Sequence, residues 1–216
     1  MKSIFAAITI LFATQTVAMD LVNFNKHVDV SNVIVDENCA GVVLSSKEGI
    51  VLTAAHCVKA EAVDIEITLI KRQGYKDSVT INYLADVVSY MPDDDTALLK
   101  THSEIMDKVE TPIYSGPVPL RGSVVWLVGN PDRMYAMVTK GIFTSTNNMV
   151  KNTKLYMVDA QAVGGSSGGG AYTDEGELIG ITSVGRTGAS LAGIIPIAHI
   201  IEDIMAVCNE CTPKEG

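Results

Sequence analysis

Basic residues are scarce in this chain. Its 216 residues include 16 Lys and Arg against 25 Asp and Glu, a formal net charge of −9, and no run of Lys or Arg occurs. A protein that binds nucleic acid neutralises phosphates with clustered basic side chains, so we expect no nucleic-acid partner. Charged residues make up 19% and apolar residues 47%, which indicates a folded globular protein rather than a disordered one.

Long hydrophobic runs are also lacking, apart from a short one near the start. Lys2 precedes an apolar stretch from Ile4 to Ala13, and the small residues Thr16-Val-Ala18 follow it. The stretch is shorter than the ~20 residues of a membrane span and has the layout of an export signal. We predict a signal peptide over residues 1–18, then a secreted or periplasmic protein without a membrane span, in which disulfides can form. An uncleaved N-terminal anchor is the alternative.

Helical periodicity is nearly absent between Val28 and Pro196. Short apolar runs, broken by Gly, Asn, Asp and Pro, predict strands instead. These are the segments 33–35, 41–44, 50–52, 63–70, 79–88, 97–99, 124–128, 136–144, 155–158, 178–184 and 191–195. The proline-rich segment 106–122 is predicted to connect two halves, and helical spacing begins only at Ile197. We predict an all-β fold of two barrels, over residues 19–115 and 116–216, with one C-terminal helix.

Glycine is concentrated between Asp159 and Tyr172, around Ser166 and Ser167. Glycine lets backbone N–H groups approach a ligand closely, and such groups stabilise an oxyanion that develops beside a serine nucleophile. A flexible Gly/Ser linker is a weaker interpretation, because strand-like segments flank the stretch on both sides. Residues 165–169 also have the G-x-S-x-G spacing of the nucleophile elbow of α/β-hydrolases.

Two motifs in the first half decide between these interpretations. Thr53-Ala-Ala-His56-Cys57 resembles the histidine motif of trypsin/chymotrypsin-like serine proteases, and Asp95-Thr-Ala-Leu-Leu99 resembles their acid motif. Gly165-Ser-Ser167-Gly-Gly169 resembles their nucleophile motif. The order His, Asp, Ser is that of chymotrypsin-like enzymes, whereas an α/β-hydrolase needs the serine first. The resemblance covers roughly residues 30 to 207. The order of the three motifs excludes the nucleophile elbow of α/β-hydrolases.

The resemblance implies two six-stranded antiparallel β-barrels and a catalytic triad of His56, Asp95 and Ser167. A serine hydroxyl attacks only when a base accepts its proton, and a histidine oriented by a buried carboxylate does so near neutral pH. The backbone N–H groups of Gly165 and Ser167 would form the oxyanion hole. Ser166 is the alternative nucleophile, and the neighbouring Asp93 and Asp94 are interpreted as solvated loop residues. The resemblance further implies a disulfide between Cys39 and Cys57.

The second half is most similar to the bacterial HtrA-type proteases. The shared segments are Val128-Gly-Asn-Pro131, Val138-Thr-Lys-Gly-Ile142, Asp159-Ala160, Gly176-Glu-Leu-Ile-Gly-Ile181 and Ile195-Pro-Ile197. Too few residues follow the last helix for a PDZ domain, so we expect none. Ser166 stands where trypsin-like enzymes carry the Asp that receives a freed N-terminal amine. We therefore expect the oxyanion loop to be ordered by contacts of the loop itself or by a ligand.

The resemblance also places the pocket for the residue before the scissile bond. Its walls would be residues 161–164 and Ser183-Val184-Gly185, with Ser183 also helping to hold the catalytic Asp. Gln161 stands where trypsin places its acidic residue, and a neutral amide cannot compensate the desolvation of a buried cation. Thr182 stands where glutamate-selecting relatives place a histidine, although Arg186 could favour acidic side chains. Together with Ala162, these residues predict small or medium uncharged side chains such as Ala, Val, Leu or Thr.

No cofactor or metal is expected. Cys208-Asn-Glu-Cys211 has the C-x-x-C spacing found in zinc and redox sites, but two cysteines do not complete a zinc site. We interpret this pair as a local disulfide at the end of the last helix. The remaining histidines, His27, His102 and His199, lack a catalytic context and are interpreted as surface or helix residues.

The sequence thus predicts an exported serine endopeptidase that acts on proteins or peptides through an acyl-enzyme. Two alternatives stay open at this point. The first is a peptide-binding protein of the same fold that does not cleave its ligand, and the second is an esterase or acyltransferase on the protease fold.

Overall fold

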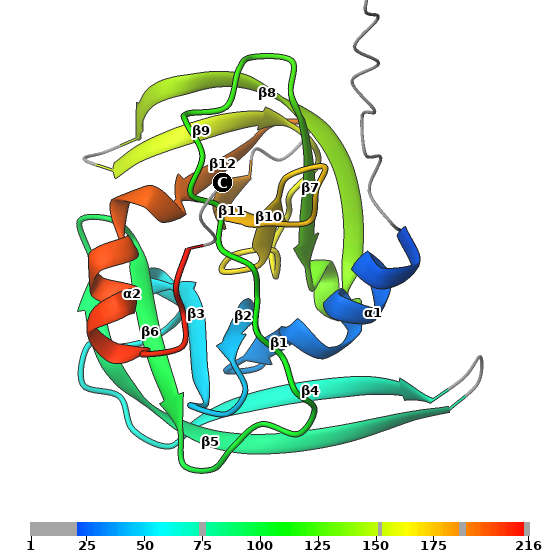
Figure 1. Ribbon diagram of the computed structural model, residues 1–216, viewed down its shortest axis with the longest axis vertical. Helices are drawn as coiled ribbons and strands as arrows, with labels where there is room; N and C mark the ends of the chain where they lie inside the picture. The colour runs from blue at the N-terminus through cyan, green and yellow to red at the C-terminus, as the bar shows by residue number, and fades with distance from the viewer. Residues whose placement is uncertain (1–20, 74–76, 151–152, 186–188, 214–216) are drawn as a thin grey trace, which may run out of the picture.

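The computed structural model describes residues 21–73, 77–150, 153–185 and 189–213. The predicted signal peptide, residues 1–18, and Arg186 lie outside the described residues. The twelve strands of the described part close into two antiparallel barrels, one above the other in Figure 1. This confirms the predicted fold class.

The first barrel closes in the order β1-β2-β3-β6-β5-β4. Its strands are β1 (Asn32–Val35), β2 (Cys39–Ser45), β3 (Ile50–Ala54), β4 (Ile65–Gln73), β5 (Asp77–Met91) and β6 (Thr96–Thr101). The hairpin of β4 and β5 is in continuous register from Ile65 opposite Ala85 to Gln73 opposite Asp77, and it forms the long ribbon at the bottom of Figure 1.

The second barrel closes in the order β10-β11-β12-β9-β8-β7. Its strands are β7 (Val124–Gly129), β8 (Met137–Val150), β9 (Thr153–Asp159), β10 (Gly170–Tyr172), β11 (Leu178–Gly185) and β12 (Ala192–Pro196). Every strand predicted from the sequence is present, but the short β10 was not predicted. It closes the barrel by pairing with both β7 and β11.

The two barrels are joined by an extended segment without a named strand between β6 and β7, as the prolines predicted. Along this segment Ser45 bridges Glu110, and Ile113 bridges both Leu178 and Pro213. The connection therefore touches the second barrel before residue 115. The predicted domain boundary at 115/116 itself stays a prediction.

The predicted C-terminal helix is present in two pieces. A 3-10 turn, η3 (Ile197–His199), is followed by α2 (Ile201–Val207), because Ile200 between them leaves the helical conformation. Beyond α2, Cys208 and Cys211 are joined in the local disulfide that the sequence suggested. Glu210 then contacts Lys47 and Ser45, so the C-terminal segment packs on the first barrel.

A helix before the first barrel was not predicted. It is α1 (Leu21–Ser31), on the right in Figure 1, and it packs against the second barrel. The Phe24 ring lies 5.9 Å from the Trp126 ring and 5.5 Å from the Tyr172 ring, measured between centroids. Because α1 leads directly into β1, this packing fixes the entry of the first barrel against the second.

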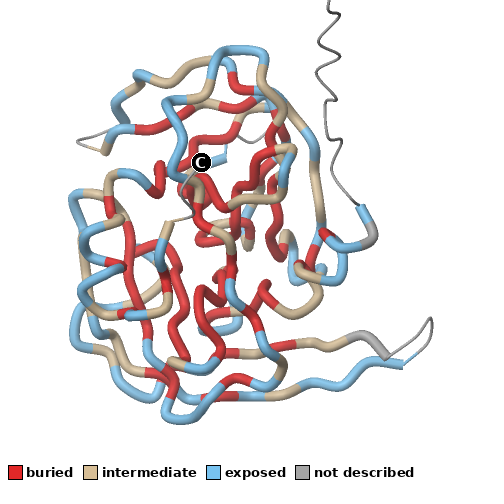
Figure 2. Tube along the Cα trace, in the orientation of Figure 1, coloured by how far each residue is buried: buried red, intermediate tan, exposed pale blue. Residues whose placement is uncertain are grey.

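Apolar side chains fill each barrel and the space between them, and Figure 2 shows this buried interior along the strands. Val33, Ile67 and Leu99 represent the core of the first barrel. Val125 and Phe143 represent the core of the second. A third cluster, which includes Leu52, Leu98, Tyr172 and Ile181, spans the interface. The site described below lies at this interface.

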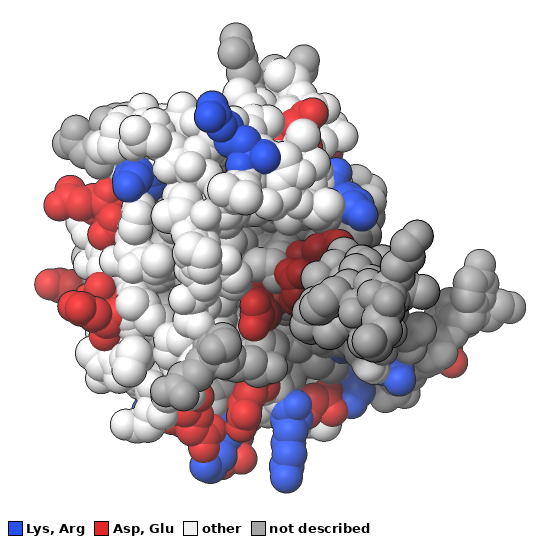
Figure 3. Space-filling view, turned by 45° about the horizontal axis from the view of Figure 1, so that its top comes forward, with Lys and Arg blue, Asp and Glu red and all other residues white. Residues whose placement is uncertain are grey.

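Acidic side chains form several groups on the face drawn in Figure 3, and Lys and Arg side chains are scattered over its upper part and its edges. Among the described residues, no helix is long and apolar enough to cross a membrane.

Candidate active site

His56 stands in a 3-10 turn, η1 (Ala55–Cys57), directly after β3. The turn is fixed by Asp95 from the loop before β6. The Asp95 carbonyl oxygen accepts a hydrogen bond from the Ala55 amide (3.0 Å), and its Oδ1 accepts one from the His56 amide (3.1 Å). The backbone of the histidine is thus held by the residue that its side chain also contacts.

Both carboxylate oxygens of Asp95 lie 2.9 Å from His56 Nδ1. Asp95 adopts a φ of 50°, a left-handed conformation that aspartate tolerates better than most residues. Its side chain is 19% exposed, whereas that of His56 is 47% exposed. Burial disfavours the Asp95 carboxylate, but hydrogen bonds from His56 and Ser183 outweigh it and hold the pKa of Asp95 below its ordinary value.

Ser183 joins Asp95 to the second barrel. It is the extra residue where the pairing of β11 with β12 shifts between Thr182 and Val184, and such a bulge re-aims a side chain. Ser183 is buried, and its hydroxyl donates to Asp95 Oδ2 at 2.5 Å. Its carbonyl oxygen accepts a hydrogen bond from Ser167 Oγ at 3.3 Å. The sequence prediction that Ser183 helps to hold Asp95 therefore agrees with the geometry.

The loop that carries Ser167 packs directly on the first barrel. The Ser167 carbonyl oxygen accepts a hydrogen bond from the Ala40 amide at 2.7 Å. Gly168 has a φ of +81°, and a Cβ there would overlap the carbonyl oxygen of Ala40 and the hydroxyl of Thr53. Only glycine permits this approach, which explains one glycine of the Ser-Gly-Gly motif.

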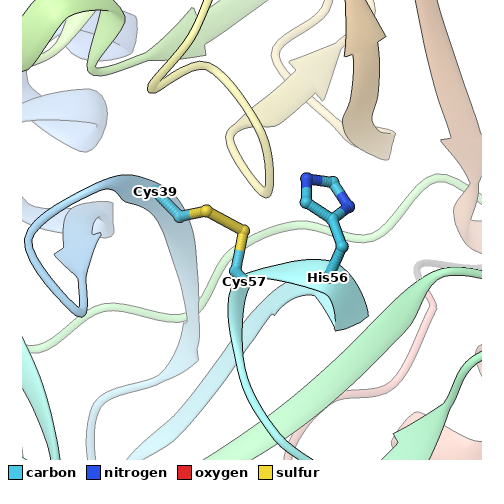
Figure 4. A group of neighbouring side chains, drawn as sticks. All are labelled: Cys39, His56 and Cys57. Atoms are coloured by element: carbon cyan, nitrogen blue, oxygen red, sulfur yellow. A yellow bond between two sulfur atoms is a disulfide. The ribbon is translucent and has the colours of Figure 1, made fainter.

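Cys39 and Cys57 form the disulfide that the resemblance implied. Figure 4 shows it rising from the same turn as His56, with a loop of the second barrel descending between the disulfide and the imidazole. Cys57 Sγ lies 4.0 Å from the Ser167 carbonyl oxygen. The disulfide thus supports both the histidine turn and the serine loop.

Two backbone N–H groups of the serine loop are available to a ligand. Within the described part of the chain, neither the Gly165 nor the Ser167 amide donates to a protein acceptor. The neighbouring Ser166 is 9% exposed, its amide donates to the Val163 carbonyl oxygen at 3.0 Å, and its hydroxyl accepts from the Val163 amide at 3.4 Å. Ser166 is thus turned into its own loop.

The walls of the predicted specificity pocket touch one another. A Cβ on Gly185 would overlap the carbonyl oxygen of Ala162, so the segments 161–164 and 183–185 are in close contact there. A separate cavity of about 20 Å³ is lined by residues that include Gln161, Ala162 and Thr182, and by none of residues 183–185. That volume is close to the space of one water molecule. Val184 packs against the core between the barrels and does not line this cavity.

A larger cavity of about 590 Å³ opens on the other side of the serine loop. It is bounded by Cys39 and Glu37 of the first barrel and by Asn130, Gly164 and Gly165 of the second. It therefore reaches the serine loop at Gly164 and Gly165.

Two groups of side chains in the described segments could offer metal ligands. Cys39, Cys57 and His56 form the first, but its sulfurs are joined in the disulfide. Asp64, Asp86 and His102 form the second, on the surface of the first barrel, where His102 Nε2 lies 3.0 Å from Asp86 Oδ1. Neither group includes Ser167. The other two histidines stand on other elements, His27 on α1 and His199 on η3.

A double barrel with a histidine, a carboxylate and a serine at its interface defines the chymotrypsin-like class. This chain belongs to the family of trypsin-like peptidase domains, whose family model matches residues 39–181.

Known relatives agree with this assignment. Protease Do-like 2, chloroplastic, from Arabidopsis thaliana is 34% identical over 142 residues, which are 62% of this chain and 22% of that protein. Serine endoprotease DegS from Haemophilus influenzae is 27% identical over 162 residues, 72% of this chain and 44% of that protein. The chain spans less than half the length of these curated relatives.

Among solved structures, a serine endoprotease from Yersinia pestis has a TM-score of 0.70 and 24% sequence identity. The match covers 89% of this chain and 68% of that one. It supports the double-barrel fold.

One residue of the site had no predicted role. Asn130 appeared only within the shared segment Val128-Gly-Asn-Pro131, and nothing in the sequence indicates its partner. In the structure it lies beside Gly165, whose carbonyl oxygen accepts a hydrogen bond from the backbone N–H of Asn130 at 3.2 Å.

Proposed function

We propose that this chain is a serine endopeptidase that cleaves peptide bonds through an acyl-enzyme, with Ser167 as nucleophile, His56 as base and Asp95 as the orienting acid. The observation that carries the proposal is the contact of both Asp95 oxygens with His56 Nδ1 at 2.9 Å. An imidazole held in this way keeps its proton on Nδ1 and leaves Nε2 to accept one from serine.

The reaction begins when Ser167 Oγ attacks the carbonyl carbon of the substrate and its proton passes to His56 Nε2. The hydroxyl first leaves its hydrogen bond to the Ser183 carbonyl oxygen by rotating about its Cα–Cβ bond. His56 then carries a positive charge, which the Asp95 carboxylate stabilises. A carboxylate whose pKa is lowered stays ionised for this role at neutral pH.

The negative oxygen of the tetrahedral intermediate accepts hydrogen bonds from the Gly165 and Ser167 amides. One such donor is worth about 10²–10³ in rate in proteases of this kind. The C–N bond breaks, and the amine leaves with the proton from His56. Water then attacks the acyl-enzyme, His56 takes its proton, and the acid product is released as that proton returns to Ser167.

The pocket favours small uncharged side chains before the cleaved bond. The close contact of Gly185 with Ala162, and the volume of only about 20 Å³ in the cavity beside Gln161 and Ala162, give a large side chain little room. Gln161 supplies an amide rather than a charge, so Lys and Arg lack a partner. Ala, Val and Thr therefore fit better than Leu, with modest discrimination of about 10–200-fold per methylene.

Export belongs to the same proposal. The apolar start of the chain has the layout of a signal peptide over residues 1–18, and the two disulfides are of the kind that forms outside the cytosol. The protein would then act in a secreted or periplasmic setting.

Cleavage profiling of a denatured proteome tests the proposal, with wild type and Ser167→Ala side by side. We expect new chain ends after Ala, Val or Thr with wild type only. No new ends, with hydrolysis of a simple ester retained, would indicate an esterase instead. A profile dominated by Lys or Arg would contradict the pocket, and one dominated by Glu would implicate Arg186.

A further inference from the structure

The orientation of the oxyanion loop, residues 163–167, is set from outside the loop. The Gly164 carbonyl oxygen accepts a hydrogen bond from the Asp132 amide at 3.0 Å, and the Gly165 carbonyl oxygen accepts one from Asn130. In a trans peptide the C=O and N–H bonds point in opposite directions. Holding the Gly164 carbonyl on Asp132 therefore turns the Gly165 N–H away from residue 132, and in the proposed mechanism this N–H is an oxyanion donor.

Both donors belong to one turn, residues 130–134, which we call the Asn130 turn. It is closed by hydrogen bonds from the Arg133 amide to the Asn130 carbonyl oxygen (3.1 Å) and from the Met134 amide to that of Pro131 (2.8 Å). Asp132 and Arg133 have φ values of 50° and 64°, which residues other than glycine adopt rarely. A turn of this conformation persists only where its surroundings hold it.

The anchor of the turn is the Asn130 side chain, which is only 3% exposed. Its Oδ1 accepts hydrogen bonds from Asn32 Nδ2 at 2.8 Å and from the Ala136 amide at 3.0 Å. Its Nδ2 donates to the Val33 carbonyl oxygen at 2.9 Å. Asn32 and Val33 open β1, so the Asn130 side chain ties the turn across the interface to the first barrel.

We propose that Asn130 is a positioning residue, which holds the oxyanion loop in its active conformation through the amide pair with Asn32. The inference rests on the proposed protease function. Asn32 follows α1, whose Phe24 packs on Trp126 of the second barrel, so the N-terminal segment fixes its position. The pair joins β1 of the first barrel to the turn after β7 of the second barrel without using any charge.

This arrangement explains how Ser166 can replace the Asp that receives an N-terminal amine in trypsin-like enzymes. An ammonium–carboxylate pair loses its attraction when the amine deprotonates, which for an ordinary α-amino group happens at about pH 8. Amide side chains do not titrate in this range. The oxyanion loop should therefore stay ordered into the alkaline range, without a newly cut N-terminus.

The test compares Asn130→Ala with Asn32→Ala and the double variant, in the full chain with a peptide substrate. Asn38→Ala is the matched control. Asn38 is exposed and, like Asn130, lines the cavity of about 590 Å³ between the barrels. We expect kcat to fall by about 10–1,000-fold in Asn130→Ala, since an oxyanion donor is misplaced, with KM changed less than threefold. Asn32→Ala should lose less, and the double variant should lose no more than Asn130→Ala.

Hydrogen exchange over residues 129–134 supplies a readout that does not depend on activity. The Asn130 and Asp132 amides should exchange at least about 10-fold faster in Asn130→Ala, while exchange in β4 and β5 is unchanged. If wild type hydrolyses no peptide, the proposed function fails, yet this measurement still decides whether Asn130 holds the loop. If Asn130→Ala does not fold, Asn32→Ala decides it in the same way.

Three results would overturn the inference. The first is a kcat in Asn130→Ala within threefold of wild type. The second is unchanged hydrogen exchange over residues 129–134. The third is a wild-type activity that falls between pH 8 and 9.5 and that is also lost when the N-terminal amine is blocked.

Discussion

Ser183 donates a hydrogen bond to Asp95 across the interface between the two barrels, with its Oγ 2.5 Å from Asp95 Oδ2. Asp95 precedes β6 of the first barrel, and Ser183 is the bulged residue of β11 in the second. The proposed orienting acid thus comes from the first barrel and is held in place by a residue of the second. Correct docking of the barrels is therefore a condition for the catalytic geometry.

Ser183→Ala should lower kcat/KM by about 10–100-fold, because a hydrogen bond to a charged group is worth about 1.5–3 kcal/mol. The pKa of Asp95 should rise toward its ordinary value as this donor is lost. The stability that Asp95 provides is present above its ordinary pKa and disappears as pH falls through the lowered one, so the variant should lose less stability on acidification. Steady-state kinetics and acid unfolding measure both effects, with Ser89→Ala on β5 as control. Unchanged kinetics would deny the contact a role.

Gly168→Ala should unfold the interface or abolish activity, since its Cβ would overlap the Ala40 carbonyl oxygen and its φ is +81°. Gly164→Ala is the matched control in the same loop, because a Cβ there meets no atom within 4 Å. Thermal unfolding should place the first variant well below wild type and the second near it. Equal stability of the two variants would show that the loop does not pack on β2 as described.

Much of this molecule could be predicted from its sequence because strands, turns and motifs are local signals. The apolar runs located the strands, and short motifs singled out His56, Asp95 and Ser167 as a triad, which stays a prediction. β10 was missed because Gly170-Ala-Tyr172 is too short and too rich in glycine to show alternation. α1 was missed because its pattern is weak and its stability comes from Phe24 packing on Trp126, far along the chain.

The contacts of Asn130, and the role proposed from them, could not be predicted for a related reason. Its partner Asn32 is 98 positions away, and two buried amides leave no periodic signal. The contact of Gly185 with Ala162 likewise could not be predicted, because it depends on how two loops fold together. The sequence identified the chemical groups, and long-range packing determined their positions.

The two disulfides should differ in their effect on stability. The loop closed by Cys39 and Cys57 spans 18 positions, whereas Cys208 and Cys211 are 3 positions apart. In the loop-entropy model these separations correspond to about 3 and about 1.5 kcal/mol. Replacing both cysteines of each pair by serine, followed by denaturant unfolding, measures the difference. The first variant should also lose activity, because its disulfide supports the turn of His56. A larger loss from the C-terminal pair would contradict this account.

His27 should make folding sensitive to mild acid. Burial lowers the pKa of His27 from 6.5 to about 4, and its Nε2 lies 3.3 Å from Thr111 Oγ1. The unfolded chain therefore binds a proton before the folded one, and stability should fall as pH drops from 6.5 to about 4. The full effect is at most about 3 kcal/mol, at 1.36 kcal/mol per pKa unit. Unfolding of wild type and His27→Gln across this range tests it. Identical pH dependence of the two would refute the role of His27.

Labelling with a fluorophosphonate tests the central claim most directly, because the reagent bonds to a serine only when a base and an oxyanion hole activate it. Wild type, Ser167→Ala, Ser166→Ala and His56→Ala are treated in parallel, and the labelled peptide is identified by mass spectrometry. We predict stoichiometric labelling of wild type on Ser167, retained labelling in Ser166→Ala, and none in the other two variants. Labelling on Ser166, or a folded wild type that does not react, would contradict the proposed triad.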